Sequence, residues 1–518
     1  MKPQQLFTHS DPAAPPSEPP ACGVLANLPA LGVIVLAIAS SVVLTFSGCA
    51  SSAGIASTAQ PIAPISIGLD SASAGSVIVP AALVPAVAAD WWRSFNDPAL
   101  TGLVERALAD NPSLKVAQAR LARAAAAVSG AQAADGPQLN GSLDVTRQRF
   151  SATSIYPPPL GGSIRTLGTA QIGGAWELDF FGRNRAAIDA AVGTQRAAQA
   201  DVQAARNLLA SNVARTYVQL GRLFAQREVA QRSLTQRDEI LTLIRQRVQG
   251  GLDTAVEQRQ GEGAPAESRQ QIEALDEQIA LTRHALAALS VQAPNALDTL
   301  VVPLRSVQAV PLPASVPADL LGRRADIAAA RWRIEAATGD TKSAKAQFYP
   351  NINLTAFVGL ASIGLDQLIK AGSEQYGAGP AIRLPIFDSG RLRANLGAKT
   401  ADLDAAIESY NGAVLDAVHD VADQIASLRS VDRQQAEQVR AQAAAESAYD
   451  LSTQRYKAGL GTYLTVLNAE ATVLAQRRQS ADLKARALDA QIALIRSLGG
   501  GYAIDAKLSA AALIPGAL

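Results

Sequence analysis

The chain has 518 residues, of which 48% are hydrophobic and 4% aromatic, so it is long enough to bury a sizeable core. Its 46 Lys and Arg residues are balanced by 45 Asp and Glu residues, which leaves a net charge of +1. A chain this close to neutrality lacks the basic surface that a nucleic-acid partner requires, so we expect no nucleic-acid binding.

The N-terminal segment resembles a bacterial export signal. An apolar run from Val24 to Phe46 is followed by Ser47 and Gly48, small residues directly before Cys49. We therefore expect residues 1–48 to be a signal peptide with a lipobox, and Cys49 to carry acyl chains such as palmitate. Because Ala50 is not the Asp that retains lipoproteins at the inner membrane, the resemblance implies the outer membrane. The alternative is a transmembrane anchor helix, since the run is long enough to span a bilayer.

The next segment has the composition of a linker. Residues 51–89 are mostly Ala, Ser, Pro, Gly and Ile, with Asp70 as the one charged residue. This composition predicts that residues 49–89 form a lipidated, flexible tether. Folding is expected to begin near Asp90.

An internal duplication follows. Gly182 and Arg183 recur 208 residues later as Gly390 and Arg391. The same spacing carries five further residues onto their counterparts: Arg247, Gly251, Leu252, Thr254 and Glu262 recur as Arg455, Gly459, Leu460, Thr462 and Glu470. We expect a first repeat over 90–300, a second over 301–502 and a C-terminal tail over 503–518. Each repeat is predicted to contain a short helix, two strands and two long helices.

Two segments show the alternation of half-buried strands. Apolar and polar residues alternate over 169–180 and again over 351–358. Segments of this kind, about ten residues long, match membrane-spanning strands. With two strands in each repeat, the sequence predicts four membrane strands per chain. The alternative is four strands of a soluble sandwich.

The helical predictions rest on spacing and on proline. No proline occurs from Leu160 through Ala264 or from Ile386 through Ile514. The helical pattern between residues 186 and 248 would span on the order of 90 Å. Gly251 and Gly459 permit the chain to reverse into a second long helix in each repeat. Shortly after the first reversal, Gly261, Gly263 and Pro265 are expected to interrupt the outgoing helix, with a kink at the proline.

Strand number predicts oligomerisation. Four strands cannot close a membrane barrel, because known closed barrels have at least about eight and an open edge leaves backbone groups unpaired in lipid. Three copies would supply twelve strands. The sequence therefore predicts a mixed α and β homotrimer with a 12-stranded β-barrel and a helical tunnel.

Several motifs resemble those of the outer membrane factor family, which has the TolC-like fold. They are Trp91-Trp92-Arg93-Ser94-Phe95-Asn96-Asp97-Pro98, Leu384-Pro385-Ile386-Phe387-Asp388-Ser389-Gly390-Arg391 and Arg455-Tyr456-Lys457-Ala458-Gly459-Leu460. Over Asp90 to about Tyr502 the chain is most similar to the NodT-type, OprM-like lipoprotein branch. The resemblance implies an exit duct that spans the outer membrane and extends into the periplasm, where it works with an adaptor protein and an inner-membrane efflux pump.

The same resemblance implies a gate where the long helices reverse. The residues expected to form it are Tyr463, Leu464, Thr465 and Asn468. Asn468 stands where relatives commonly carry an aspartate, so a ring of amides would replace a ring of carboxylates. In the first repeat, Asp253 and Glu257 are candidates for the tunnel mouth, the alternative being solvated helix-end charges.

Other functions fit the sequence less well. His9, His284 and His419 are isolated and lack metal-ligand spacing, and no phosphate-binding loop or nucleophile elbow is present. We therefore expect no enzyme, metal site or cofactor. A type I secretion exit channel and a non-channel helical surface lipoprotein remain the alternatives to an efflux duct.

Overall fold

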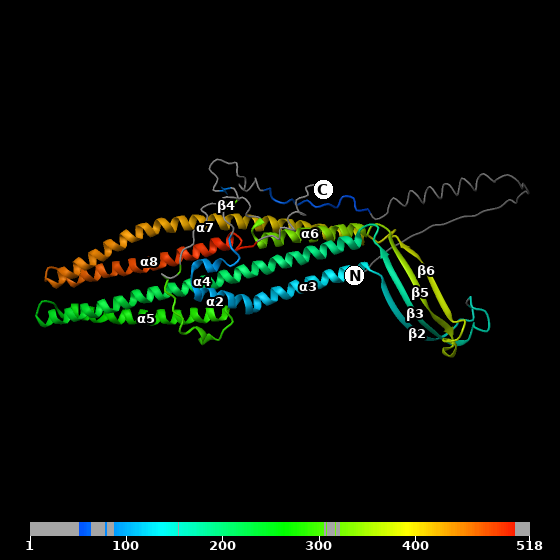
Figure 1. Cartoon of the computed structure of the whole chain (residues 1–518), viewed down its shortest axis with the longest axis horizontal. Coiled ribbons are helices and arrows are strands. Elements are labelled where there is room, and N and C mark those ends of the chain that lie inside the picture. Colours follow the sequence, from blue (N-terminus) through cyan, green and yellow to red (C-terminus); the bar gives the residue numbers. More distant parts are fainter. Residues whose placement is uncertain are drawn as a thin grey trace, which may run out of the picture.

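The computed structural model describes residues 51–63, 78–79, 87–153, 155–304, 307, 316–317 and 322–502. The predicted signal peptide, Cys49 and the tail over 503–518 lie outside these residues. The described chain forms a long rod of helices with a small sheet at one end (Figure 1).

The helices account for most of the chain. They are η4 Trp91–Phe95, α2 Pro98–Asp110, α3 Pro112–Asp135, α4 Arg183–Gln249, α5 Ala255–Leu289, η5 Pro294–Leu297, α6 Ala325–Ala346, η7 Leu365–Gln367, α7 Arg391–Lys457 and α8 Tyr463–Ser497. Both α4 and α7 contain 67 residues, which gives each a length of about 100 Å. This confirms the predicted long helices. Within the described residues, no helix combines the length and the apolar character needed to cross a lipid bilayer.

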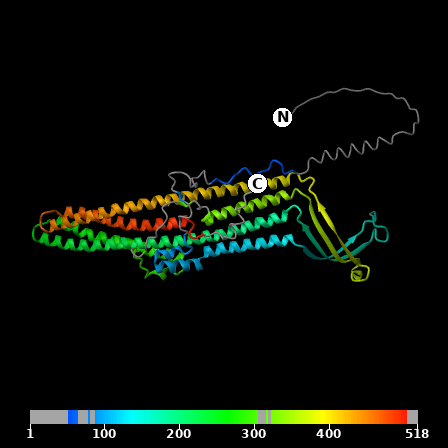
Figure 2. The ribbon, with the colours of Figure 1, turned by 45° about the horizontal axis from the view of Figure 1, so that its top comes forward.

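Helices α3 to α8 lie side by side in a single layer. Next to the sheet the order of contacts is α3, α4, α6, α7, and towards the far end it is α5, α4, α8, α7 (Figures 1 and 2). Because α4 and α7 run the full length, the two rows form one continuous layer. Its edges are α7 on one side and α3 with α5 on the other.

The sheet is antiparallel and has two free edges. Its strands are β2 Gln138–Arg149, β3 Ile164–Leu178, β5 Asn351–Ile363 and β6 Glu374–Arg383, in the order β2-β3-β5-β6. A separate short parallel pair joins β1 Ile78–Val79 to β4 Val316–Pro317. The four strands confirm the predicted strand number, and β3 and β5 contain most of the alternating residues. Strands β2 and β6 each have a neighbour on one side only.

Strand register places most of the large apolar residues on one face. Leu143 pairs with Ala170, Ala170 with Leu360, and Ile172 with Val358. Directly paired residues of antiparallel strands share a face, and alternate residues along a strand share it too. The apolar face is therefore continuous across all four strands: Leu139, Leu143, Val145, Ala170, Ile172, Trp176, Leu178, Ile352, Leu354, Ala356, Val358, Leu360, Tyr376, Ala378, Pro380 and Ile382.

The duplication predicted from the sequence is visible in the element order. Helices α7 and α8 begin 208 residues after α4 and α5. The repeated glycines before the long helices, Gly182 and Gly390, have φ of 74° and 86°. Side chains rarely adopt this left-handed conformation, so glycine suits the abrupt change from strand to helix.

Helices η4 and α2 pack on one face of the layer, and we refer to them together as the cover. Trp91, Trp92 and Phe95 are buried together with residues of α2 and α4. The Tyr217 hydroxyl of α4 donates to Asp97 Oδ2 over 2.8 Å, and Asp97 Oδ1 also accepts from the Leu100 amide at the start of α2. This double role of Asp97 fixes the cover to the long helix.

The first residues of the predicted tether, 51–63, lie hydrogen-bonded along α7, where Asp404 Oδ1 accepts from the Ser57 hydroxyl over 2.5 Å. One sequence prediction needs correction: helix α5 is not interrupted and continues through Pro265 to Leu289. A Cβ at Gly261 would lie 2.7 Å from Ile244 Cδ1, so this glycine permits close packing against α4.

Candidate functional site

The far end of the rod consists of two helix reversals with the same geometry. The Leu252 amide donates to the Arg247 carbonyl over 2.8 Å, and the Leu460 amide donates to the Arg455 carbonyl over 2.8 Å. The intervening glycines have φ of 70° and 77°, as a Schellman turn requires. These turns leave Leu252 and Leu460 69% and 70% exposed at the end of the molecule. We refer to this end as the tip.

A polar network connects the two reversals at the tip. Arg247 Nε lies 2.9 Å from Asp253 Oδ2, and Arg247 Nη1 donates to the Tyr456 carbonyl over 3.1 Å. The Tyr456 hydroxyl donates to the same Asp253 carboxylate, and the guanidinium carbon lies 4.6 Å from the centre of the Tyr456 ring. The network therefore joins the first reversal to α7 of the second repeat.

The environment keeps the Asp253 carboxylate charged. Burial by itself raises the pKa of Asp253, but hydrogen bonds from Arg247 and Tyr456 outweigh burial and leave that pKa below its usual value. Burial and the hydrogen bond to Asp253 raise the pKa of the Tyr456 hydroxyl. At neutral pH the Asp253 carboxylate is therefore charged and the Tyr456 hydroxyl keeps its proton, so the hydrogen bond between them is maintained.

The predicted gate residues separate into two groups. Tyr463 is only 4% exposed and packs inside the hairpin, its ring centroid 6.1 Å from that of Tyr456. Leu464, Thr465 and Asn468 are exposed on the first turns of α8. Because Leu464 and Asn468 are four residues apart, they lie on the same side of the helix.

The two predicted mouth residues have structural partners. The side chain of Asp253 is only 10% exposed and belongs to the network described above. Glu257 accepts hydrogen bonds from the Thr254 amide and hydroxyl, which completes a capping box at the start of α5. These bonds lower the pKa of Glu257.

The two reversals differ because their residues have diverged. Asp253 corresponds, 208 residues later, to Gly461, so Arg455 lacks the carboxylate that Arg247 has. Arg455 instead donates to the Leu460 carbonyl over 3.4 Å. The repeated arginines were visible in the sequence, but their different partners were not.

A buried ion pair above the tip was missed by sequence reasoning. Arg237 Nε of α4 lies 2.7 Å from Glu470 Oε1 of α8, with 14% and 8% of the two side chains exposed. Arg237 Nη1 also donates to the Ala264 carbonyl of α5 over 2.7 Å. The available signal was the position of Glu470 between Val466 and Val473, at the spacing of a buried helical stripe.

The described residues contain no group of three or more His, Cys, Asp or Glu side chains placed to hold a metal ion. The polar groups of the tip instead pair with one another and with helix ends. Such an arrangement fixes the relative positions of the two hairpins.

Comparison with known proteins identifies the class. The profile of a family described as outer membrane efflux protein matches residues 103–290 and 316–500. The multidrug resistance outer membrane protein MdtQ of Escherichia coli is 35% identical over 420 residues, covering 80% of this chain and 88% of the relative.

Solved structures agree with this family match. The outer membrane protein VceC of Vibrio cholerae superposes with a TM-score of 0.76 at 35% identity, covering 80% of this chain and 99% of VceC. The open-state outer membrane channel MtrE of Neisseria gonorrhoeae gives 0.70 at 26% identity, covering 86% of this chain and 96% of MtrE. The fold and these neighbours define a subunit of an outer-membrane efflux channel. The chain belongs to the outer membrane efflux protein family.

Proposed function

We propose that three copies of this chain assemble into an exit duct, in which the sheets close into a 12-stranded barrel and the helical layers into a tunnel. The observation that supports this most is the continuous apolar face of the sheet together with its two free edges. An edge exposed to lipid leaves N–H and C=O groups unpaired. Pairing β6 of one copy with β2 of the next satisfies these groups.

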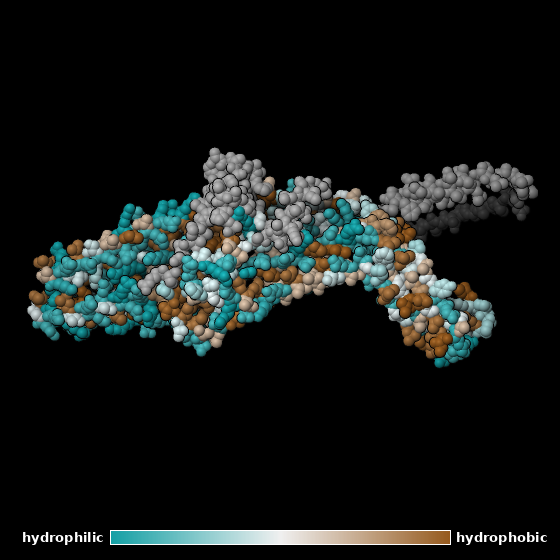
Figure 3. Space-filling model, in the orientation of Figure 1, coloured by the Kyte–Doolittle hydropathy of each residue, from teal (hydrophilic) through white to brown (hydrophobic). Residues whose placement is uncertain are grey.

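Aromatic residues support placing the sheet in the outer membrane. Phe180 and Phe387 are 68% and 84% exposed where the strands meet the helices. The rings of Phe181 and Tyr349 stack there with centroids 4.9 Å apart. Aromatic belts of this kind lie at the membrane interface of barrels. In Figure 3 the strand end of the molecule carries large hydrophobic areas.

The tip is the part of the duct that we assign to an adaptor protein and an inner-membrane pump. Besides Leu252 and Leu460, Val256 and Leu464 are 62% and 58% exposed there. Exposed apolar side chains gathered at one end of the rod are suited to contact a partner. The transported compounds are drugs or other small molecules, in line with the name of MdtQ.

Within this duct, Leu464, Thr465 and Asn468 form the closed gate. They are exposed in the single chain, and in the trimer three copies would meet around one axis. The network of Arg247, Asp253 and Tyr456 holds the hairpins in the closed arrangement. Lipidation at Cys49 provides a further attachment to the outer membrane.

A pair of neighbouring strand residues tests the barrel. Ile172 lies on the apolar face and Gln171 on the opposite face of β3. An arginine facing lipid costs about 2–4 kcal/mol at the bilayer midplane, whereas one facing a lumen remains hydrated. Ile172→Arg should therefore reduce membrane-inserted trimer, measured by native mass spectrometry and by planar-bilayer conductance, and Gln171→Arg should not. Equal effects of the two substitutions, or a monomeric unmodified protein, would contradict the proposed barrel.

A further inference from the structure

The two faces of the helical layer are not equivalent. Val213, Tyr217 and Leu220 of α4 pack against the cover formed by η4 and α2. Twelve helices spaced about 10 Å apart form a ring with a bore of roughly 28 Å. Three covers, each about one helix thick, would fill such a bore. If the proposed trimer forms, the cover must lie outside and the opposite face of α4 must line the tunnel.

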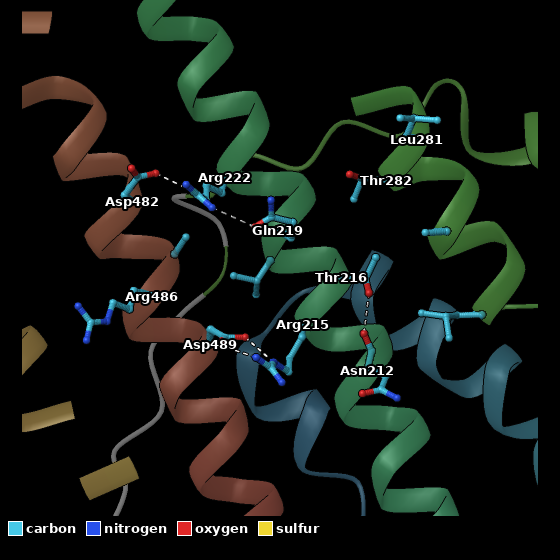
Figure 4. Close-up of a pocket in the computed structure, with 14 residues that line it drawn as sticks. Asn212, Arg215, Thr216, Gln219, Arg222, Leu281, Thr282, Asp482, Arg486 and Asp489 are labelled. Atoms are coloured by element: carbon cyan, nitrogen blue, oxygen red, sulfur yellow. Dashed lines mark hydrogen bonds and ion pairs between the residues drawn. The ribbon is translucent and has the colours of Figure 1, made fainter. Parts of the chain in front are cut away.

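A groove lies on this opposite face. It has a volume of about 940 Å³ and is bounded by α4, α5 and α8. Arg215 and Arg222 line it, and each lies two residues from Val213 or Leu220, a rotation of about 200° around the helix. In Figure 4 the Arg215 and Arg222 side chains extend from α4 toward Asp489 and Asp482 of α8.

The charges along the groove do not cancel. Arg215 Nε lies 2.6 Å from Asp489 Oδ1, and Arg222 Nε lies 2.7 Å from Asp482 Oδ1. Arg486, on α8 between these two aspartates, is exposed and has no hydrogen-bond or ion-pair partner among the residues that the structure describes. Each subunit therefore presents one uncompensated guanidinium at this level of the tunnel face.

We propose that the three copies of Arg486 form a cationic ring inside the tunnel, at the level of the outer cover, and that this ring attracts anions. Its ligands are inorganic anions and solutes that carry a carboxylate or a phosphate, which a guanidinium binds through paired N–H donors. This inference depends on the proposed trimer. It predicts that the middle of the duct prefers anions to cations. The gate lies far from it, at the tip.

The concentration of anions that the ring attracts depends on the ionic strength. Three unit charges about 10 Å from an ion in water raise the local anion concentration roughly fourfold at an ionic strength of about 10 mM. At about 1 M the screening length falls to roughly 3 Å and the effect disappears. Arg486 should therefore influence ion selectivity in dilute salt only.

Reversal potentials of the full-length trimer in planar bilayers under a potassium chloride gradient test this ring. In dilute salt, Arg486→Gln should lower the ratio of anion to cation permeability at least threefold, and Arg486→Lys should keep the ratio of the unmodified protein. The matched control is Arg93→Gln, which removes the same charge from the cover, where Arg93 pairs with Glu105 over 2.6 Å. Arg93→Gln should leave the ratio unchanged.

The possible outcomes distinguish a failure of the proposed ring from a failure of the proposed duct. A conducting Arg486→Gln trimer with an unchanged permeability ratio would overturn the cationic ring and leave the duct intact. An equal shift in Arg93→Gln would also overturn it, because the charge on the cover would then act as strongly as the charge in the tunnel. An unmodified protein that forms no membrane-inserted trimer would overturn the proposed duct, and the ring with it.

Discussion

At the scale of single residues, the tip contains the side chains to which we assign the proposed gate. Exposed Leu464 and Asn468 face away from the hairpin, whereas Tyr463 supports it from inside. A closed gate needs side chains that reach an axis, and a buried ring cannot do so. This difference separates the proposed gate residues, Leu464 and Asn468, from Tyr463, which supports them from inside the hairpin.

Substitution of the exposed gate residues should change conduction. Asn468→Asp places three like charges near the proposed axis, which repel one another and attract cations. We expect larger single-channel conductance and stronger cation selectivity for Asn468→Asp, and larger conductance for Leu464→Ser. Unchanged conductance and selectivity in both variants, with trimers verified, would place the gate elsewhere.

The network at the tip should also hold the gate closed. Hydrogen bonds to charged groups contribute about 1.5–3 kcal/mol, so Asp253→Asn should raise the open fraction of the channel at neutral pH by about tenfold or more. Planar-bilayer recordings measure this fraction. Glu257→Gln is the control, because Glu257 caps α5 without joining the two repeats. The same open fraction in both variants would contradict a special role for Asp253.

The pKa of Asp253 predicts how the stability of the closed tip depends on pH. Since folding lowers the pKa of Asp253, its stabilising contribution is complete above the unfolded pKa of about 3.9 and is lost as the pH falls through the folded value. The closed tip should therefore be constant between about pH 5 and 8 and weaken only below about pH 4. Opening centred near pH 6 would show that another group controls the tip.

At the scale of elements, the seam between α4 and α6 depends on two glycines. A Cβ at Gly339 would lie 2.8 Å from the Ala190 nitrogen, and one at Gly193 would lie 2.8 Å from the Ala336 nitrogen. Because backbone atoms occupy this space, a side chain must push the helices apart. The seam joins the first repeat to the second, since α4 and α6 belong to different repeats.

A matched pair of substitutions tests this seam. Replacing a helical glycine by alanine stabilises the folded protein by roughly 0.5–1 kcal/mol where there is room for the methyl group. Gly397 of α7 has such room, because a Cβ at this position would have no heavy atom within 4 Å. Gly339→Ala should instead destabilise by about 1–3 kcal/mol, because overpacking forces backbone shifts. Thermal unfolding of both variants should show midpoints moving in opposite directions. A Gly339→Ala midpoint equal to that of Gly397→Ala would contradict close packing at the seam.

The docked segment over 51–63 is a second feature at this scale. Asp404 Oδ1 accepts from the Ala59 amide over 3.3 Å, in addition to the Ser57 hydroxyl, and Asn411 Oδ1 accepts from the Ile62 amide over 2.7 Å. The hydrogen bonds to Asp404, led by the one from Ser57, lower the pKa of its carboxyl group. The carboxylate therefore remains charged throughout the neutral range.

Hydrogen exchange of the docked segment measures this contact. Asp404→Ala should accelerate amide exchange over residues 57–59, because the amides lose their acceptor. The control is Asp402→Ala, since Asp402 lies near Lys399 and is 64% exposed. Equal exchange in the two variants would show that the segment is held by other contacts.

At the scale of the whole molecule, the predicted lipid anchor and the proposed trimer are the features to test. The predicted lipid at Cys49 can be tested by labelling with radioactive palmitate, and Cys49→Ala should abolish the label. The barrel should still insert, because its strands would anchor it independently. Label retained in Cys49→Ala would refute lipidation at this position.

Much of the fold could be predicted from local patterns. The 208-residue spacing placed the helix reversals at Gly251 and Gly459, and alternation identified strand segments within β3 and β5. These features depend on residues that are neighbours in the chain. Backbone conformation at glycine and the two periodicities of helix and strand are local properties, so the sequence by itself determined them.

Only the tertiary structure decided which residues meet across the repeats. The partners Asp253 and Tyr456 are 203 residues apart, and Arg237 and Glu470 are 233 apart. The alignment of apolar residues across four strands likewise depends on register between distant segments. No local pattern specifies such pairs, because helix packing and strand register set them. For that reason the sequence offered Asp253 as a candidate for the tunnel mouth but did not predict its network with Arg247 and Tyr456.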